Sequence, residues 1–164
     1  MTELTSLRPA TDADADALID LIGAVYAEYP GCVMDLPGVD ADLPRWASAL
    51  AAAGGRGWVL PDDEGLAACV GFAPHDVDGS PGGELKRLYV AAPHRGRGLG
   101  AALVGHVEAA IAADGGVVVE LWSDHRFTDA HRLYERLGYA RTGESRHLGD
   151  PSDTTEFRFV RRLT

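Results

Sequence analysis

The stretch that decides the fold spans residues 84–101 and reads ELKRLYVAAPHRGRGLGA. Its first seven residues, 84–90, predict a strand, with apolar and polar side chains on both faces. A glycine-rich segment, residues 94–100, follows this strand. The next segment predicts an amphipathic helix whose apolar stripe is formed by Leu99, Leu103, Val107 and Ile111. The stretch therefore predicts a strand, a glycine loop and a helix in succession.

The glycine loop has the composition of an anion-binding site. No side-chain cap precedes the helix, so its first amides are left free to donate, at the positive end of the helix dipole. Glycines at 96, 98 and 100 allow a ligand to approach the backbone, and Arg95 and Arg97 add positive charge. We interpret the loop as a pyrophosphate site, the alternative being a tight turn without a ligand.

The same glycines also satisfy a loose dinucleotide-binding pattern, Gly96-x-Gly98-x-x-Ala101, with Glu120 at the end of the next expected strand. Residues 91–95 separate the strand from the first glycine, whereas a dinucleotide fold turns almost directly from strand to glycine. The 44 residues after Glu120 also leave no room for a second nucleotide-binding half. A nucleotide-binding module therefore stays as the less favoured alternative.

The remaining pattern predicts an α+β domain with a mixed, mostly antiparallel central sheet flanked by helices. Thr11, followed three residues later by Asp14, predicts the start of the first helix. A polar turn is expected at residues 76–83. The expected strands cover residues 4–8, 58–60, 66–73, 84–90, 117–122, 139–144 and 154–162, and the expected helices cover 11–29, 45–53, 99–111 and 128–137.

Length and composition restrict the class of protein. The chain has 164 residues, 46% hydrophobic and 24% charged, which is typical of one soluble globular domain, here residues 1–164. No apolar run approaches the roughly 18 residues that a membrane helix needs, and no export signal is visible at the start. Cys32 and Cys69 lack metal-ligand spacing, so we expect idle or buried thiols in the cytoplasm.

The charge is unevenly distributed along the chain. Net charge is −10, which argues against general nucleic-acid binding. Residues 1–80 hold 14 acidic and 3 basic side chains, whereas residues 81–164 hold 11 acidic and 12 basic ones. This asymmetry is consistent with a cationic ligand on one side and an anionic ligand on the other, or with a solvated surface alone.

Two segments together resemble a known family. The strand 84–90, Pro93 and the pattern Arg95-x-x-Gly98-x-Gly100 resemble motif A of the GNAT superfamily of N-acetyltransferases, whose loop binds the pyrophosphate of acetyl-CoA. Residues 133–139, LYERLGY, resemble its motif B, and residues 7–14 resemble its first strand and helix. Motifs in this order over nearly the whole chain are more specific than either glycine pattern alone.

The resemblance implies the residues that bind acetyl-CoA. The main chain of Leu88, Tyr89 and Val90 would pair with the pantetheine arm. The pyrophosphate would be held by Arg95, Gly96, Arg97, Gly98, Leu99, Gly100 and Ala101. Phe127 stands where family members usually have an asparagine that contacts the cofactor. His131 or Asp129 is the candidate to replace that contact.

The resemblance also nominates two catalytic residues. An alkyl ammonium must lose a proton before it attacks, and a departing thiolate is helped by gaining one. Glu84 has the spacing of the catalytic glutamate in some members of the family and is the candidate general base, with an edge carboxylate paired to Lys86 or Arg87 as the alternative. Tyr134 matches the general acid, with a core aromatic as the alternative.

The implied activity is direct, acetyl-CoA-dependent transfer of an acetyl group to a primary amine of a small molecule or peptide. It uses no metal, nucleic acid or membrane, and a homodimer is compatible with it. A catalytically silent CoA-binding domain is the main alternative. Candidate contacts around the acceptor site are Tyr26, Glu28, Tyr29 and Asp35, with an ordinary surface loop as the favoured alternative. His125, Arg126 and His131 lie where substrates dock in such folds, with histidines there by chance as the alternative. The motifs do not specify the amine.

Overall fold

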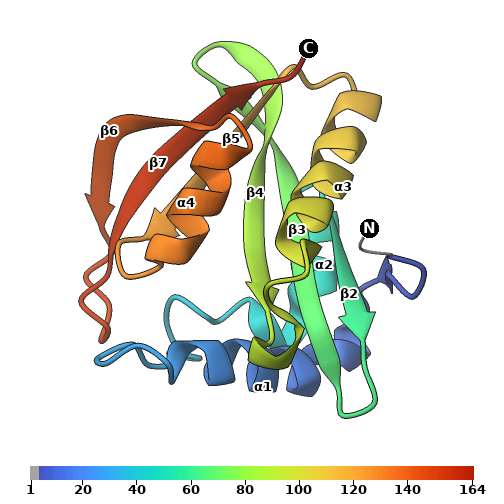
Figure 1. Cartoon of the computed structure of the whole chain (residues 1–164), viewed down its shortest axis with the longest axis vertical. Helices are drawn as coiled ribbons and strands as arrows, with labels where there is room; N and C mark the ends of the chain where they lie inside the picture. Colours follow the sequence, from blue (N-terminus) through green and yellow to red (C-terminus); the bar gives the residue numbers. More distant parts are fainter. Residues whose placement is uncertain (1–3) are drawn as a thin grey trace.

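The computed structural model describes residues 4–164, which form a seven-stranded sheet in the order β1-β2-β3-β4-β5-β7-β6 (Figure 1). Neighbouring strands are antiparallel except β4 and β5, which are parallel. The predicted α+β class and mostly antiparallel sheet are therefore confirmed. The strands are β1 (Arg8–Pro9), β2 (Arg56–Pro61), β3 (Leu66–Val77), β4 (Ser80–Val90), β5 (Val118–Asp124), β6 (Ala140–His147) and β7 (Thr155–Arg162).

Helices cover both faces of the sheet. The α-helices are α1 (Ala15–Tyr26), α2 (Trp46–Ala52), α3 (Leu99–Ala113) and α4 (Thr128–Arg136). Short 3-10 turns precede three of them, at η1 (Asp12–Asp14), η2 (Leu43–Arg45) and η3 (Ala92–His94). In the view of Figure 1, α3 and α4 lie to either side of β4, and α1 crosses below the strands.

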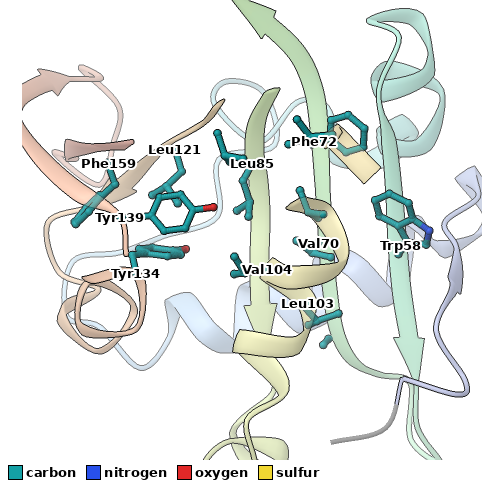
Figure 2. Packing of buried hydrophobic residues seen from close by; sticks show 14 of the residues in the cluster. Trp58, Val70, Phe72, Leu85, Leu103, Val104, Leu121, Tyr134, Tyr139 and Phe159 are labelled. Carbon is teal, nitrogen blue, oxygen red and sulfur yellow. The ribbon is translucent and has the colours of Figure 1, made fainter. Parts of the chain in front are cut away.

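Alternation along the strands divides the core into two layers. Val70 of β3 packs in the cluster that contains α3 and Tyr134 of α4, whereas the preceding Cys69 packs with α1 and α2. Figure 2 shows Leu103 and Val104 of α3 in the first of these layers, beside Val70. Both cysteines are free and buried, as expected.

The prediction of a polar turn over residues 76–83 is wrong. β3 continues to Val77 and β4 begins at Ser80, so the turn consists of Asp78 and Gly79 alone. Both residues have positive φ, 48° and 85°, which matches the right-handed twist of the hairpin. The Asp-Gly pair is a strong hairpin signal, and it outweighs the polar composition around it.

The chain start also differs from expectation in part. A strand was expected at residues 4–8, but β1 contains only Arg8–Pro9. Residues 4–7 form a turn instead, in which the Leu7 N–H donates to Leu4 O at 3.0 Å. The helix start is confirmed, since the Thr11 N–H donates to Asp14 Oδ2 at 2.8 Å. Arg8 donates to the same carboxylate, at 2.7 and 2.9 Å, and fixes the strand to the helix.

Candidate active site

A cleft opens where β4 and β5 part. The described parallel ladder between them ends at Glu84 and Glu120, although β5 remains paired with β7 as far as Asp124. The space beyond the ladder is a cleft of about 590 Å³ lined by β4, β5, α4 and the connector after α1. Because the β5-facing edge of β4 has no strand partner there, it can pair with an extended ligand.

A bulge in β4 turns the strand at this point. Cys69 of β3 pairs with Tyr89 and Gly71 pairs with Lys86, so Arg87 and Leu88 together face one residue, Val70. Arg87 itself has a φ of 56°, which is rare for a residue with a side chain. The bulge redirects residues 88–90, the segment predicted to contact the pantetheine arm.

The glycine loop delivers the N-terminus of α3 to the cleft end of β4. Gly96 and Gly98 have φ values of 77° and 78°, a conformation that glycine adopts without strain, and α3 begins at Leu99 with no side-chain cap. A Cβ at Gly96 would meet open space, so a ligand can approach that backbone. Gly100 has a packing role as well, since a Cβ there would lie 3.0 Å from Leu133 of α4.

Arg95 is held by a carboxylate 67 residues away in sequence. Its Nε donates to Val90 O at 2.9 Å, and its two terminal nitrogens bind Glu28 at 2.6 and 2.7 Å. Hydrogen bonding to Arg95 lowers the pKa of Glu28. Glu28, expected near the acceptor, therefore lies beside the loop predicted to bind pyrophosphate. An anionic ligand on Arg95 would compete with this ion pair.

Tyr134 is both a core residue and part of the cleft wall. Only 5% of it is exposed, and its ring packs against Tyr139 and Phe159 with centroids 5.9 and 5.6 Å away (Figure 2). Within residues 4–164 its hydroxyl has no hydrogen-bond partner, although the residue lines the cleft. Burial raises the pKa of Tyr134, so the phenol stays protonated at neutral pH. The two interpretations of Tyr134 are therefore compatible.

Glu84 lies at the point where the two strands separate. It lines the cleft, and Lys86 Nζ lies 3.7 Å from its Oε2. Arg87, the other partner considered for it, points instead to Asp40 and Asp42. Glu84 is thus near a lysine at a loose distance and forms part of the cleft wall.

Phe127 and His131 lie in different environments. Phe127 lines the cleft and packs against Tyr29 and Tyr89, with centroids 4.9 and 6.3 Å away. His131 is only 4% exposed, and its Nε2 is 3.0 Å from Asp124 O. Burial lowers the pKa of His131. These contacts favour a structural role for His131 at the end of β5.

The connector after α1 and the loop between β6 and β7 meet at the cleft. The Val33 N–H donates to Ser152 Oγ at 2.9 Å, and the Ser152 hydroxyl donates to Val33 O at 3.2 Å. Arg126 also donates to Ser152 O and binds Asp124 at 2.9 Å. These bonds link segments 119 residues apart in sequence and form a second wall opposite β4.

The other residues expected around the acceptor are distributed unequally. Tyr26 lines the cleft, where its hydroxyl donates to Asp40 Oδ1 at 3.1 Å. Asp35 folds its own loop by accepting from Val39 N at 3.2 Å. His125 lies next to Asp124, with 3.4 Å between Nδ1 and Oδ1.

Arg87 and Asp40 line the cleft, although the sequence did not single them out as site residues. Arg87 reads as one polar position in a mixed strand, and Asp40 as one acid in an acid-rich loop. Their ion pair, 2.8 Å long, joins residues 47 apart, so no local spacing predicts it.

The family profile described as "Acetyltransferase (GNAT) family" matches residues 21–139, most of the chain. The chain belongs to this family. The match contains β4, the glycine loop, α3, β5 and α4, of which β4, β5 and α4 line the cleft. Comparison with curated proteins gave no match.

Solved structures of GNAT acetyltransferases share the fold. A Staphylococcus aureus Mu50 acetyltransferase of this family superposes with a TM-score of 0.78 at 16% identity, over 96% of this chain and 98% of that one. An acetyltransferase from Salmonella typhimurium, solved with its cofactor acetyl-CoA, gives 0.69 at 19% identity, over 96% and 93%. An aminoglycoside 6'-N-acetyltransferase in complex with coenzyme A gives 0.67 at 18% identity, over 96% and 97%.

Residues 4–164 contain no group of three or more side chains of the types that could hold a metal ion. In the same part of the chain, no helix is long and apolar enough to cross a membrane.

Proposed function

We propose that this GNAT acetyltransferase is an acetyl-CoA-dependent N-acetyltransferase that transfers the acetyl group directly to a primary amine of a small molecule or peptide. The observation that carries the proposal is the cleft between β4 and β5. It combines an unpaired strand edge, a tyrosine hydroxyl that makes no hydrogen bond within residues 4–164, and a carboxylate where the two strands part.

The residues present fit acetyl-CoA as the acetyl donor. The β4 edge at Leu88, Tyr89 and Val90 would pair with the pantetheine amides. The loop from Arg95 to Ala101 would hold the pyrophosphate through the α3 amides and the arginines. Phe127 offers a ring face where other family members usually have an amide side chain. Bound acetyl-CoA would supply an activated acetyl group with a thiol leaving group.

Two side chains would act as the general base and the general acid of the reaction. An alkyl ammonium has a pKa near 10.4, so the acceptor must lose a proton before it attacks. Glu84 would accept that proton, directly or through water. The thiol has a pKa near 8.5, and Tyr134 would donate a proton to the departing sulfur. Both residues line the same cleft, which is the condition for direct transfer without a covalent enzyme intermediate.

A thiol-release assay over a panel of amines tests the proposal. The panel compares monoamines, diamines, amino acids, aminoglycosides and short peptides with acetyl-CoA as donor. We expect CoA release that depends on both the amine and acetyl-CoA. Tight acetyl-CoA binding in calorimetry with no release for any amine would favour the silent CoA-binding domain. Binding of NAD or ATP but not acetyl-CoA would favour a nucleotide-binding module.

A further inference from the structure

Arg87 combines a positive φ with a side chain that makes four hydrogen bonds. Its φ of 56° is unfavourable for a residue with a Cβ, and such conformations persist where the surroundings fix them. Nη1 donates to Asp40 Oδ1 at 2.8 Å and to the Tyr26 hydroxyl at 3.2 Å. Nη2 donates to Asp42 Oδ1 at 2.6 Å and to Val39 O at 3.2 Å. The guanidinium thus binds four acceptors outside its own strand.

Asp40 is the centre of the segment that Arg87 holds. It is 1% exposed, and its Oδ2 accepts from Asp35 N at 2.9 Å. Its other oxygen accepts from Arg87 and from Tyr26. The 35–42 segment is therefore folded around a buried carboxylate whose charge is compensated by Arg87. Without that guanidinium, the buried charge would force the segment to rearrange.

The held segment belongs to the cleft. Residues 38–42 line it from the α1 side, whereas Leu88 and Tyr89, which follow Arg87 directly, line it along β4. The backbone of Arg87 forms the bulge that turns β4. Its side chain holds residues 39–42, which form the α1-side wall of the cleft. One residue thus connects the two surfaces between which an acetyl group would pass.

We infer that Arg87 is a positioning residue, which sets the 35–42 segment as the acceptor wall of the cleft. The inference rests on the proposed function. Arg87 acts through Asp40 and Asp42 on the place where the amine binds, whereas the bulge itself needs only the backbone conformation. Loss of the guanidinium should accordingly weaken productive amine binding more than acetyl-CoA binding.

Three variants test this inference by steady-state kinetics. Arg87→Lys keeps the charge but cannot reach four acceptors at once. Asp40→Asn removes the buried charge and keeps the side-chain size. The double variant Arg87→Gly with Asp40→Asn guards against misfolding, since glycine accepts the positive φ and no buried carboxylate is left unpaired. Arg161→Lys is the matched control, because Arg161 pairs with Glu108 at 2.7 Å and does not line the described cleft.

The expected result is a split between the two substrates. In Asp40→Asn and the double variant, the amine KM should rise about 10- to 100-fold, while KM for acetyl-CoA changes less than about threefold. Arg87→Lys should give an intermediate amine KM, and Arg161→Lys should match the wild type. Wild-type kinetics in the double variant, or equal increases in both KM values, would overturn the inference and leave the proposed function intact. A wild-type protein without turnover for any amine would overturn both.

Discussion

At the residue scale, the hydroxyl of Tyr134 separates catalysis from packing. Because this hydroxyl makes no hydrogen bond within the described residues, Tyr134→Phe should leave the melting temperature and the acetyl-CoA affinity nearly unchanged. Loss of a general acid should lower kcat by about 100-fold, near the bottom of the usual range. Kinetics, calorimetry and thermal melts on one preparation check this. Tyr134→Ala serves as the packing control and should cost a few kcal/mol of stability.

The raised pKa of Tyr134 also predicts how the activity depends on pH. Burial raises the pKa of Tyr134 above its ordinary value of about 10, so the proton is retained, and activity should not fall, as pH rises to about 9.5. Deprotonation of the ammonium should make kcat/KM rise over the same interval. A descending limb below pH 9 in the wild type, absent in Tyr134→Phe, would show that the pKa of the phenol lies below its ordinary value. Such a result would contradict the buried-acid assignment.

Glu28 offers a second test at this scale. It occupies both terminal nitrogens of Arg95, so it should compete with the pyrophosphate. Glu28→Gln should strengthen acetyl-CoA binding by up to about fivefold, because an exposed ion pair is worth about 0.2–1 kcal/mol. Calorimetric Kd values check this. Glu135→Gln removes the same charge from the exposed pair with Arg141 and should leave the Kd unchanged. Weaker binding in Glu28→Gln would show instead that Glu28 orients Arg95 for its ligand.

The sequence predicted candidate site residues only where these lie near one another in the chain. The strand 84–90 and the loop 95–101 adjoin in sequence, so one pattern predicts both, and residues 84–89 of this segment line the cleft. The contact between Arg87 and Asp40 depends on how the connector after α1 folds onto β4, and no periodicity contains that information. His131 has the spacing of a site residue but is turned into the core by its contact with Asp124 O.

At the element scale, the glycine loop must keep its left-handed turns for α3 to present its amides. Valine at 98 would oppose the φ of 78°, since a β-branched side chain is strongly disfavoured there. Gly98→Val should raise the acetyl-CoA Kd at least about tenfold, as measured by calorimetry, through loss of the backbone donors. The matched control is Gly105→Val within α3, where a Cβ meets open space. An unchanged Kd in Gly98→Val would remove the loop from the site.

The order of elements was predictable because each motif lies on one element or one junction. The β4–loop–α3 junction and the α4 helix follow directly from hydrophobic spacing and glycines. The extent of the β3–β4 hairpin was not predictable, because the polar residues around Asp78 and Gly79 continue the strands instead of ending them. Their partners across the ladder, as in the pairing of His75 with Gly82, decide the strand length.

At the scale of the whole molecule, the charge of the cleft should select the acceptor. Its lining contains more carboxylates than cations: Asp40, Asp42, Glu84, Asp124, Asp150 and Glu156 against Lys86, Arg87 and Arg146. We expect kcat/KM to be higher for a diamine than for an amino acid of equal length. The advantage should shrink as ionic strength rises, because salt screens the field. A panel whose best substrate is an acidic amino acid, with no dependence on salt, would contradict this expectation.

The central claim is that the acetyl group passes directly from acetyl-CoA to an amine in the cleft between β4 and β5. Incubation of the wild type with isotopically labelled acetyl-CoA and its best amine, followed by mass spectrometry of amine, protein and CoA, tests it most directly. We expect one labelled acetyl group on the amine for each CoA released, with none on the protein. CoA release without a labelled amine, or a labelled protein that transfers its label to the amine, would contradict the claim.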